Sequence, residues 1–132
     1  MKTKTKIIAF DQIAELMRIE KDNGNKIVQC HGTFDLIHPG HIIHFEESKS
    51  LGDILIVTVT GEKFVNKGPG RPYFNDDVRL KSLTALESVD YVAIVPYPAA
   101  VEAIQAVSPN IYCKGKEYEN THSDITGNMA DD

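Results

Sequence analysis

The sequence predicts an α/β domain in which a parallel sheet lies between two layers of helices. Apolar runs of strand length alternate along the chain with segments of helical periodicity, which is the pattern of successive strand–helix–strand units. The strands are nearly continuous apolar runs, typical of a parallel sheet covered on both faces. At 132 residues the chain is long enough for one hydrophobic core and too short for two. We therefore expect a single three-layer domain.

Each predicted element has its own signal. The first helix has Ile13, Leu16 and Met17 on one face, with Asp11 as its cap and Gly24 as its stop. The later strands are rich in β-branched residues and are separated by glycine or proline. The further helices are expected at 40–51, 76–88 and 99–107, and the strands at 26–30, 53–60, 91–95 and 111–113.

Composition and charge restrict the partners of the chain. A net charge of −5 argues against a broad DNA- or RNA-binding surface, and no apolar stretch approaches the ~20 residues of a membrane span. Cys30 and Cys113 lie in apolar runs, which favours buried reduced thiols over a disulfide or a metal pair. We expect no nucleic-acid partner, no membrane association and a cytoplasmic location.

The stretch HGTFDLIHPGH, residues 31–41, follows directly on the first predicted strand. In an open parallel sheet, ligands bind at the carboxyl ends of the strands, where this stretch lies. Gly32 allows a sharp turn and lets a ligand approach the backbone without a Cβ in the way. The amides of Thr33 and Phe34 are then placed to point at an anion.

Two histidines stand at the start of the next predicted helix. Pro39 and Gly40 suit the entry to this helix, whose free amides and positive dipole end favour phosphate. His38 precedes the helix and His41 lies in its first turn, so both imidazoles can face one bound anion. A metal site is the alternative, because His44 continues the spacing, but zinc on a helix prefers histidines four residues apart. We favour a phosphate clamp without a protein-held metal, and we assign His44 to packing or solvent.

Five blocks of sequence carry a family resemblance. They are GTFDLIHPGH, LGDILIVTVT, NKGPGRPYFNDDVRL, ALESVDYVAIV and SPNIYCKGKEY. In this order they resemble the cytidylyltransferase-like nucleotidyltransferases, small Rossmann-like enzymes with a His-x-Gly-His motif. The series is most similar to the adenylyltransferase domain that activates heptose 1-phosphate for lipopolysaccharide. The resemblance implies a nucleotidyltransferase domain at 26–118, an N-terminal helical extension at 1–25 and a loose or truncated polar tail at 119–132.

The resemblance also implies a reaction, in which a nucleoside triphosphate and a phosphorylated substrate give a nucleoside-diphospho product and pyrophosphate. The resemblance implies that Arg79 binds the nucleotide. An equal alternative is a structural role, in which Asp76 and Asp77 compensate the charge of Arg79 at the helix start. Asp35 has the alternative of tying its turn together through backbone amides. The implied catalytic residues are His38, His41 and Lys67, and the implied nucleotide-binding residues are Gly32, Thr33, Phe34, Asp35, Gly40, Arg71, Arg79, Gly115 and Glu117, where the family more often has aspartate at the last position.

Further expectations rest on the same resemblance. Glu87 stands where cytidylyltransferases for glycerol phosphate and choline phosphate usually carry arginine, which favours ATP over CTP. Mg²⁺ is the expected cofactor, carried mainly by the nucleotide phosphates. The family's last strand and its Ser-Thr-Thr-like motif are not found, so we expect a sheet without that strand and self-association over the apolar surface left open. The alternatives are an FMN or glycerol/alkanol-phosphate nucleotidyltransferase and a non-catalytic nucleotide-binding module.

Overall fold

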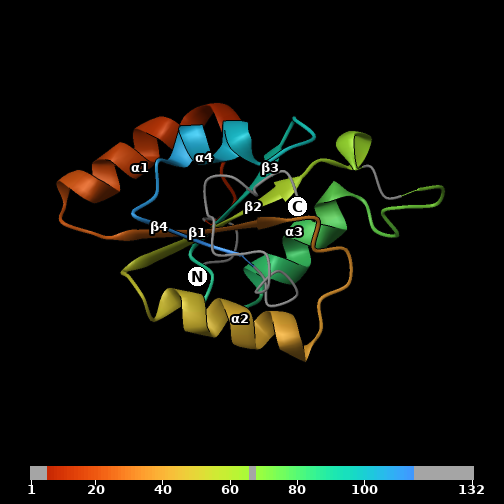
Figure 1. The fold of residues 1–132 in the computed structure, drawn as a ribbon, viewed down its shortest axis with the longest axis horizontal. Coiled ribbons are helices and arrows are strands. Elements are labelled where there is room, and N and C mark those ends of the chain that lie inside the picture. The colour runs from red at the N-terminus through yellow and green to blue at the C-terminus, as the bar shows by residue number, and fades with distance from the viewer. Residues whose placement is uncertain (1–5, 66–67, 115–132) are drawn as a thin grey trace.

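The computed structural model describes residues 6–65 and 68–114 of the chain. Its centre is a four-stranded sheet in the order β3-β2-β1-β4, with all neighbouring strands parallel (Figure 1). The predicted α/β class with a parallel sheet is confirmed. The strands are β1 (Ile27–Gly32), β2 (Ile54–Thr60), β3 (Tyr91–Val95) and β4 (Ile111–Cys113). The helices are α1 (Ile13–Asp22), α2 (Pro39–Lys49), α3 (Asp76–Thr84) and α4 (Val101–Val107), with short 3-10 turns at η2 (Phe10–Gln12) and η3 (Glu62–Phe64).

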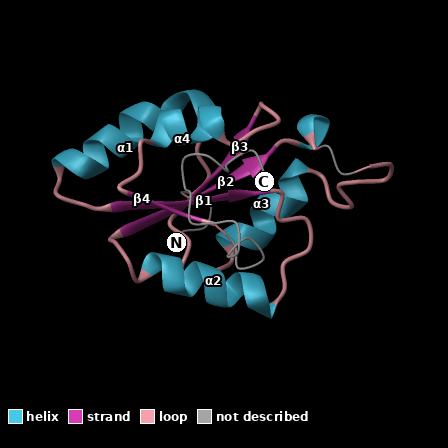
Figure 2. Ribbon diagram, in the orientation of Figure 1, coloured by secondary structure: helices cyan, strands magenta, loops and turns pink. Residues whose placement is uncertain are grey.

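Helices cover both faces of the sheet (Figure 2). On one face, Ile13 and Met17 of α1 and Val107 of α4 pack against Ile27 and Ile56 of the strands. Successive strand residues point to opposite faces, so the alternate strand residues form a second core under α2 and α3. That core contains Val28, Cys30, Phe45, Leu55, Val57, Val59, Leu80, Leu83, Val89 and Val92. The three expected layers are therefore present, and no helix in the described part is long and apolar enough to cross a membrane.

The chain leaves β1 and β3 in opposite directions across the sheet. The crossover through α2 places β2 on one side of β1, and the crossover through α4 places β4 on the other side. Such a reversal opens a crevice at the carboxyl ends of the strands that flank it, here β1 and β4, where ligands of open α/β sheets bind. The loop that follows β1 therefore begins at the edge of the sheet where the sequence predicts the site.

Several helix ends differ from the sequence prediction, and the differences at the start of α1 and the end of α3 are the clearest. Asp11 lies inside η2, and Gln12 is the residue that precedes α1, so Asp11 is not its cap. α3 ends at Thr84, before the predicted residue 88. Just past this end, Nζ of Lys6 donates to the carbonyl oxygens of Thr84 and Leu86 at 3.2 and 3.0 Å. Because these bonds satisfy carbonyl groups that lack a helical partner, they stabilise the early end of α3.

A buried polar cluster lies on the face of β1 and β2 that α1 and α4 cover. Nδ1 of His31 and Nε2 of Gln29 each lie 2.9 Å from Oγ1 of Thr58. Nε2 of His31 lies 3.2 Å from Oγ1 of Thr60. Burial disfavours the charged imidazolium and lowers the pKa of His31 from 6.5 to about 4.

We expect His31 to make the fold sensitive to acid between pH 6.5 and 4. In this range the unfolded chain binds a proton at His31 and the folded chain does not. The free energy of unfolding is therefore highest above pH 6.5 and falls as the pH drops towards 4. Thermal unfolding across this range should show a steeper fall in Tm for the wild type than for His31→Gln, whose amide does not titrate. Parallel curves of Tm against pH for the two proteins would contradict this expectation.

Candidate active site

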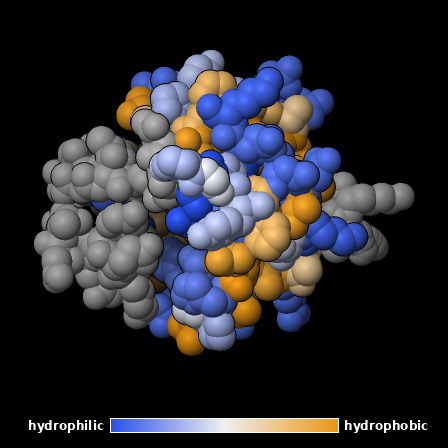
Figure 3. Space-filling model, turned by 90° about the vertical axis from the view of Figure 1, so that its right-hand side faces the viewer, coloured by the Kyte–Doolittle hydropathy of each residue, from blue (hydrophilic) through white to orange (hydrophobic). Residues whose placement is uncertain are grey.

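The loop after β1 lies over the carboxyl end of the sheet and leads into α2. Figure 3 looks onto this side of the molecule, where polar side chains in the middle have apolar ones beside and below them. Phe34 adopts the left-handed backbone conformation, with φ of 49°. Its ring folds back on the strand end, so a Cβ at Gly32 would lie 3.0 Å from Cζ of Phe34. Gly32 therefore makes room for the Phe34 ring, a role that the sequence did not predict, and its part in ligand binding stays a prediction.

His38 and His41 lie side by side at the start of α2, with ring centroids 4.1 Å apart. Nδ1 of His38 accepts the N–H of Gly40 at 3.0 Å, and Nδ1 of His41 accepts the N–H of His38 at 3.3 Å. The two imidazoles thus cap the helix in the reciprocal manner of a capping box. This double cap was not foreseen from the sequence, which assigned the pair to an anion alone.

The cap determines which ring nitrogens point away from the helix. Because Nδ1 of each ring accepts a hydrogen bond, the proton of the neutral ring lies on Nε2. Both Nε2–H groups are donors next to the positive end of the α2 dipole, which favours anions. The structure thus brings the two predicted histidines together at the start of α2, and their binding of a phosphate stays a prediction.

The glycine of the His-x-Gly-His motif leaves space for the ring of the first histidine. A Cβ at Gly40 would lie 2.9 Å from Cε1 and 3.2 Å from Nδ1 of the His38 ring. Only glycine at this position leaves the ring where it accepts the N–H of Gly40 itself. Among the described residues, no hydrogen-bond acceptor is found for the N–H groups of Thr33 and Phe34, and their binding of an anion stays a prediction.

Asp35 joins the β1 loop to the segment that precedes α3. Its carboxylate accepts the N–H groups of Tyr73 at 2.6 Å and Phe74 at 2.9 Å, and Oδ2 lies 3.6 Å from Nε of Arg71. Burial alone raises the pKa of Asp35, but the two N–H donors and the Arg71 charge outweigh it and lower the pKa overall. Asp35 therefore ties backbone amides of a distant loop, whereas its predicted alternative role was to tie its own turn together.

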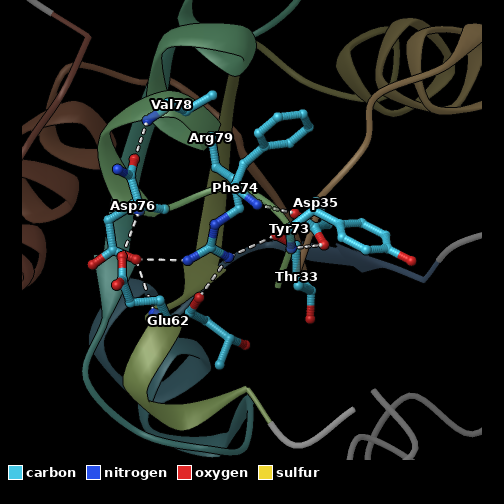
Figure 4. A network of polar contacts seen from close by, with 10 residues as sticks. Thr33, Asp35, Glu62, Tyr73, Phe74, Asp76, Val78 and Arg79 are labelled. Atoms are coloured by element: carbon cyan, nitrogen blue, oxygen red, sulfur yellow. Dashed lines mark hydrogen bonds and ion pairs between the residues drawn. The ribbon is translucent and has the colours of Figure 1, made fainter. Parts of the chain in front are cut away.

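Arg79 is the centre of a buried polar network (Figure 4). Its side chain is 0% exposed, and Nη1 donates to the carbonyl oxygens of Thr33 at 2.9 Å and Thr60 at 2.8 Å. Nη2 donates to Oδ1 of Asp76 at 2.6 Å. Asp76 and Glu62 in turn exchange two hydrogen bonds of 2.9 Å, each carboxylate accepting the N–H of the other residue. The guanidinium thus joins the end of β2, the loop after β1 and the start of α3.

This burial corrects the nucleotide-binding role that the sequence predicts for Arg79. All of its observed contacts are with protein groups, and its charge is compensated by Asp76, which is the structural alternative. Because it holds the carbonyl group of Thr33, Arg79 positions the backbone of the loop that leads to His38. Sequence reasoning missed Thr60 and Glu62, since only contacts between segments far apart in the chain give them this role.

Several predicted site residues are not placed beside the histidines. Lys67, Gly115 and Glu117 lie outside the described residues. β4 ends at Cys113 in register with Cys30 of β1, so the chain leaves β4 close to the end of β1. Glu87 precedes β3 at the amino ends of the strands, the edge of the sheet opposite the site. It therefore cannot select a nucleobase by direct contact.

The histidine that continues the spacing, His44, points away from the pair. Its Nε2 lies 3.6 Å from Sγ of Cys30 in β1, which is the packing position expected for it. Among the described residues, no group of three His, Cys, Asp or Glu side chains is arranged to hold a metal ion. Cys30 and Cys113 are free thiols, and burial raises the pKa of Cys30 to about 12, so its thiol is a poor nucleophile and metal ligand.

The chain matches one family model and several curated relatives. The family model described as Cytidylyltransferase-like matches residues 29–128. The "Bifunctional protein HldE" of Aliarcobacter butzleri is 38% identical over 129 residues, which cover 96% of this chain and 27% of that protein. The protein of the same name from Helicobacter pylori is 37% identical over 120 residues, covering 89% of this chain and 25% of its own. The chain thus spans about a quarter of the length of these curated relatives.

A solved structure has a similar fold. The crystal structure of the lipopolysaccharide core biosynthesis protein from Thermoplasma volcanium GSS1 matches with a TM-score of 0.60 and 32% sequence identity. The match covers 67% of this chain and 73% of that one.

Proposed function

This chain belongs to the cytidylyltransferase-like family of nucleotidyltransferases, and we propose that it transfers an adenylyl group from ATP to the phosphate of a sugar phosphate. The observation that carries the proposal is the adjacent pair of His38 and His41 rings at the positive end of α2, with centroids 4.1 Å apart. The relatives named HldE and the resemblance to heptose 1-phosphate adenylyltransferase domains support ATP and a sugar 1-phosphate as the substrates.

The proposed reaction forms one P–O bond and breaks another. An oxygen of the acceptor phosphate attacks the α-phosphorus of ATP, and the bond from that phosphorus to the bridging oxygen breaks. Pyrophosphate leaves with the electron pair. Since the acceptor oxygen is already ionised, the reaction needs no strong general base, and orientation and charge stabilisation set its rate. His38 and His41 donate to the charge that develops on the phosphates, and Arg79 holds the loop that precedes them.

We propose that Mg²⁺ binds together with the triphosphate and would partly neutralise its charge. The carboxylate of Asp35 is already engaged by two backbone N–H groups and by Arg71. The described residues thus offer the ion no protein cage, and we assign its coordination to phosphate oxygens and water. A cytoplasmic location and self-association remain proposals, and sedimentation across micromolar concentrations would test the second.

Two measurements on the full chain test the proposed function. Purified protein should release pyrophosphate from ATP only when a sugar 1-phosphate is added, in a panel that includes FMN and glycerol 3-phosphate as competing acceptors. ATP with Mg²⁺ should raise Tm more than CTP with Mg²⁺, and omission of Mg²⁺ should reduce the shift. A CTP shift equal to or larger than the ATP shift would overturn the choice of nucleotide. Binding of ATP without turnover of any acceptor would favour the non-catalytic nucleotide-binding module.

Gly40→Ala should lower turnover while leaving the fold intact. The added Cβ displaces the His38 ring, and small displacements of groups in a reaction site reduce rates by on the order of tenfold to a hundredfold. The weakened cap destabilises α2, but replacing glycine by alanine within a helix stabilises it by about 1 kcal/mol, so Tm should change little. Pyrophosphate release and thermal unfolding of this variant would check both parts. Wild-type turnover would show that the position of the His38 ring is unimportant.

A further inference from the structure

We propose that the exposed ring of Tyr73 is the platform on which the sugar ring of the acceptor stacks. Tyr73 lies in the segment between β2 and α3 and is 62% exposed, more than any other large hydrophobic residue that the structure describes. The inference rests on the proposed function, because it assigns a contact to the acceptor of that reaction.

Tyr73 is exposed, yet its backbone is held firmly. Its N–H donates to Asp35 at 2.6 Å, and the N–H of Phe74 donates to the same carboxylate at 2.9 Å. Figure 4 shows the Tyr73 ring directed away from the Arg79 network, on the outer side of this clamp. An aromatic ring on a fixed backbone offers a large contact area at a small cost in conformational entropy, which suits it to ligand binding.

The hydrogen bonds of Tyr73 and Phe74 to Asp35 also attach the ring to the loop of the candidate active site. Asp35 belongs to the loop that links β1 to His38, and its neighbour Phe34 contacts the ring of His41 with centroids 5.7 Å apart. Tyr73 is therefore attached to the loop that carries the phosphate clamp. The segment that carries Tyr73 follows β2 and meets this loop at Asp35, three residues before His38.

The surroundings of the ring indicate the chemistry of its ligand. The guanidinium of Arg71 lies over one face of the ring, 4.5 Å from its centroid, and the Arg71 side chain is itself 37% exposed. An open aromatic surface beside a cation suits a ligand with a flat C–H face and an anionic group. A sugar phosphate has both, because the C–H bonds on one face of the sugar ring pack on the aromatic ring while its hydroxyl groups face water. The triphosphate of the nucleotide is directed elsewhere, to the N-terminus of α2.

A single tryptophan can test whether the acceptor sugar binds at position 73, and this test needs no catalytic turnover. The chain contains no tryptophan, so Tyr73→Trp introduces one reporter and keeps an aromatic platform. With a non-hydrolysable ATP analogue present, mannose 1-phosphate or a heptose 1-phosphate should quench or shift the emission saturably, and glycerol 3-phosphate, which has no ring, should not. Leu51→Trp is the matched control, since Leu51 is also exposed but follows the far end of α2, and its emission should not respond.

Kinetics give the second readout. Tyr73→Ala should raise the KM for the sugar 1-phosphate about tenfold, the size expected for a lost aromatic stack, and leave the Tm shift with ATP unchanged. Tyr73→Phe should behave as the wild type, because the ring is kept. An emission change caused by the ATP analogue alone would overturn the inference, since the ring would then face the nucleotide. An unchanged KM in an active Tyr73→Ala protein would also overturn it. A wild type that turns over no sugar phosphate would refute the proposed function itself.

Discussion

Replacement of His38 or His41 by alanine is expected to slow pyrophosphate release by on the order of 10²–10³, the usual effect of losing one preorganised charge donor. Both rings carry their Nε2–H groups at the positive end of α2, where the charge of the transferring phosphates develops. Each ring also caps the helix, so the same variants should lose about 1 kcal/mol of unfolding free energy. Turnover with ATP and the accepted sugar phosphate, together with thermal unfolding by circular dichroism, measures both effects.

A substitution by asparagine separates the helix-capping role of His38 from its role in turnover. Asparagine is a strong helix N-cap, so His38→Asn should regain the Tm that His38→Ala loses, while its shorter side chain leaves turnover low. His44→Ala is the control for the pair, since His44 points to Cys30 and should leave turnover nearly unchanged. If His44→Ala were as inactive as His41→Ala and zinc copurified with the protein, a metal site would replace the phosphate clamp.

Arg79→Met is expected to cause the largest loss of stability, about 3 kcal/mol or more. The substitution leaves the carbonyl oxygens of Thr33 and Thr60 and the carboxylate of Asp76 without the donor that they now share. Methionine fills much of the volume, so the loss reflects two carbonyl groups left without this donor and the lost ion pair with Asp76, whose carboxylate keeps the N–H of Glu62. A domain of this size is typically stable by only about 5–15 kcal/mol, so the Tm should fall markedly.

Two further variants define the role of Arg79. Arg79→Lys keeps a charge but cannot reach three acceptors in different directions, so it should fold better than Arg79→Met and still turn over slowly. Arg18→Met is the matched control, because Arg18 pairs with Glu15 and Asp22 on the exposed side of α1 and should leave Tm almost unchanged. A stable, fully active Arg79→Met protein would show that the network does not position the β1 loop.

Sequence reasoning predicted the layers and the sheet because they depend on local periodicity. The strands at 91–95 and 111–113 have the predicted bounds, and their apolar residues alternate between two buried faces. The end of α3 could not be predicted in this way. The apolar repeat continues past Thr84, but the side chain that satisfies the carbonyl groups there belongs to Lys6, at the other end of the sequence.

In the candidate site, too, local features were predicted and contacts between distant segments were not. The sequence predicted His38 and His41 from their motif, since helix entry and anion binding are both local properties. It assigned the two glycines of the loop to a ligand, whereas the space beside them is filled by the rings of Phe34 and His38. For Arg79 it left a nucleotide-binding and a structural role open, because its acceptors on Thr33 and Thr60 are brought near only by the fold.

The paired hydrogen bonds between Glu62 and Asp76 have a consequence for the evolution of this protein. They join the point where the chain leaves the sheet after β2 to the point where it enters α3. Closing a chain segment costs an entropy that grows only slowly with its length, so insertions and deletions between two joined ends leave the scaffold almost undisturbed. The stretch between these residues can therefore change in length at little cost to the sheet and to α3, as long as Asp35 keeps its hold on the N–H groups of Tyr73 and Phe74.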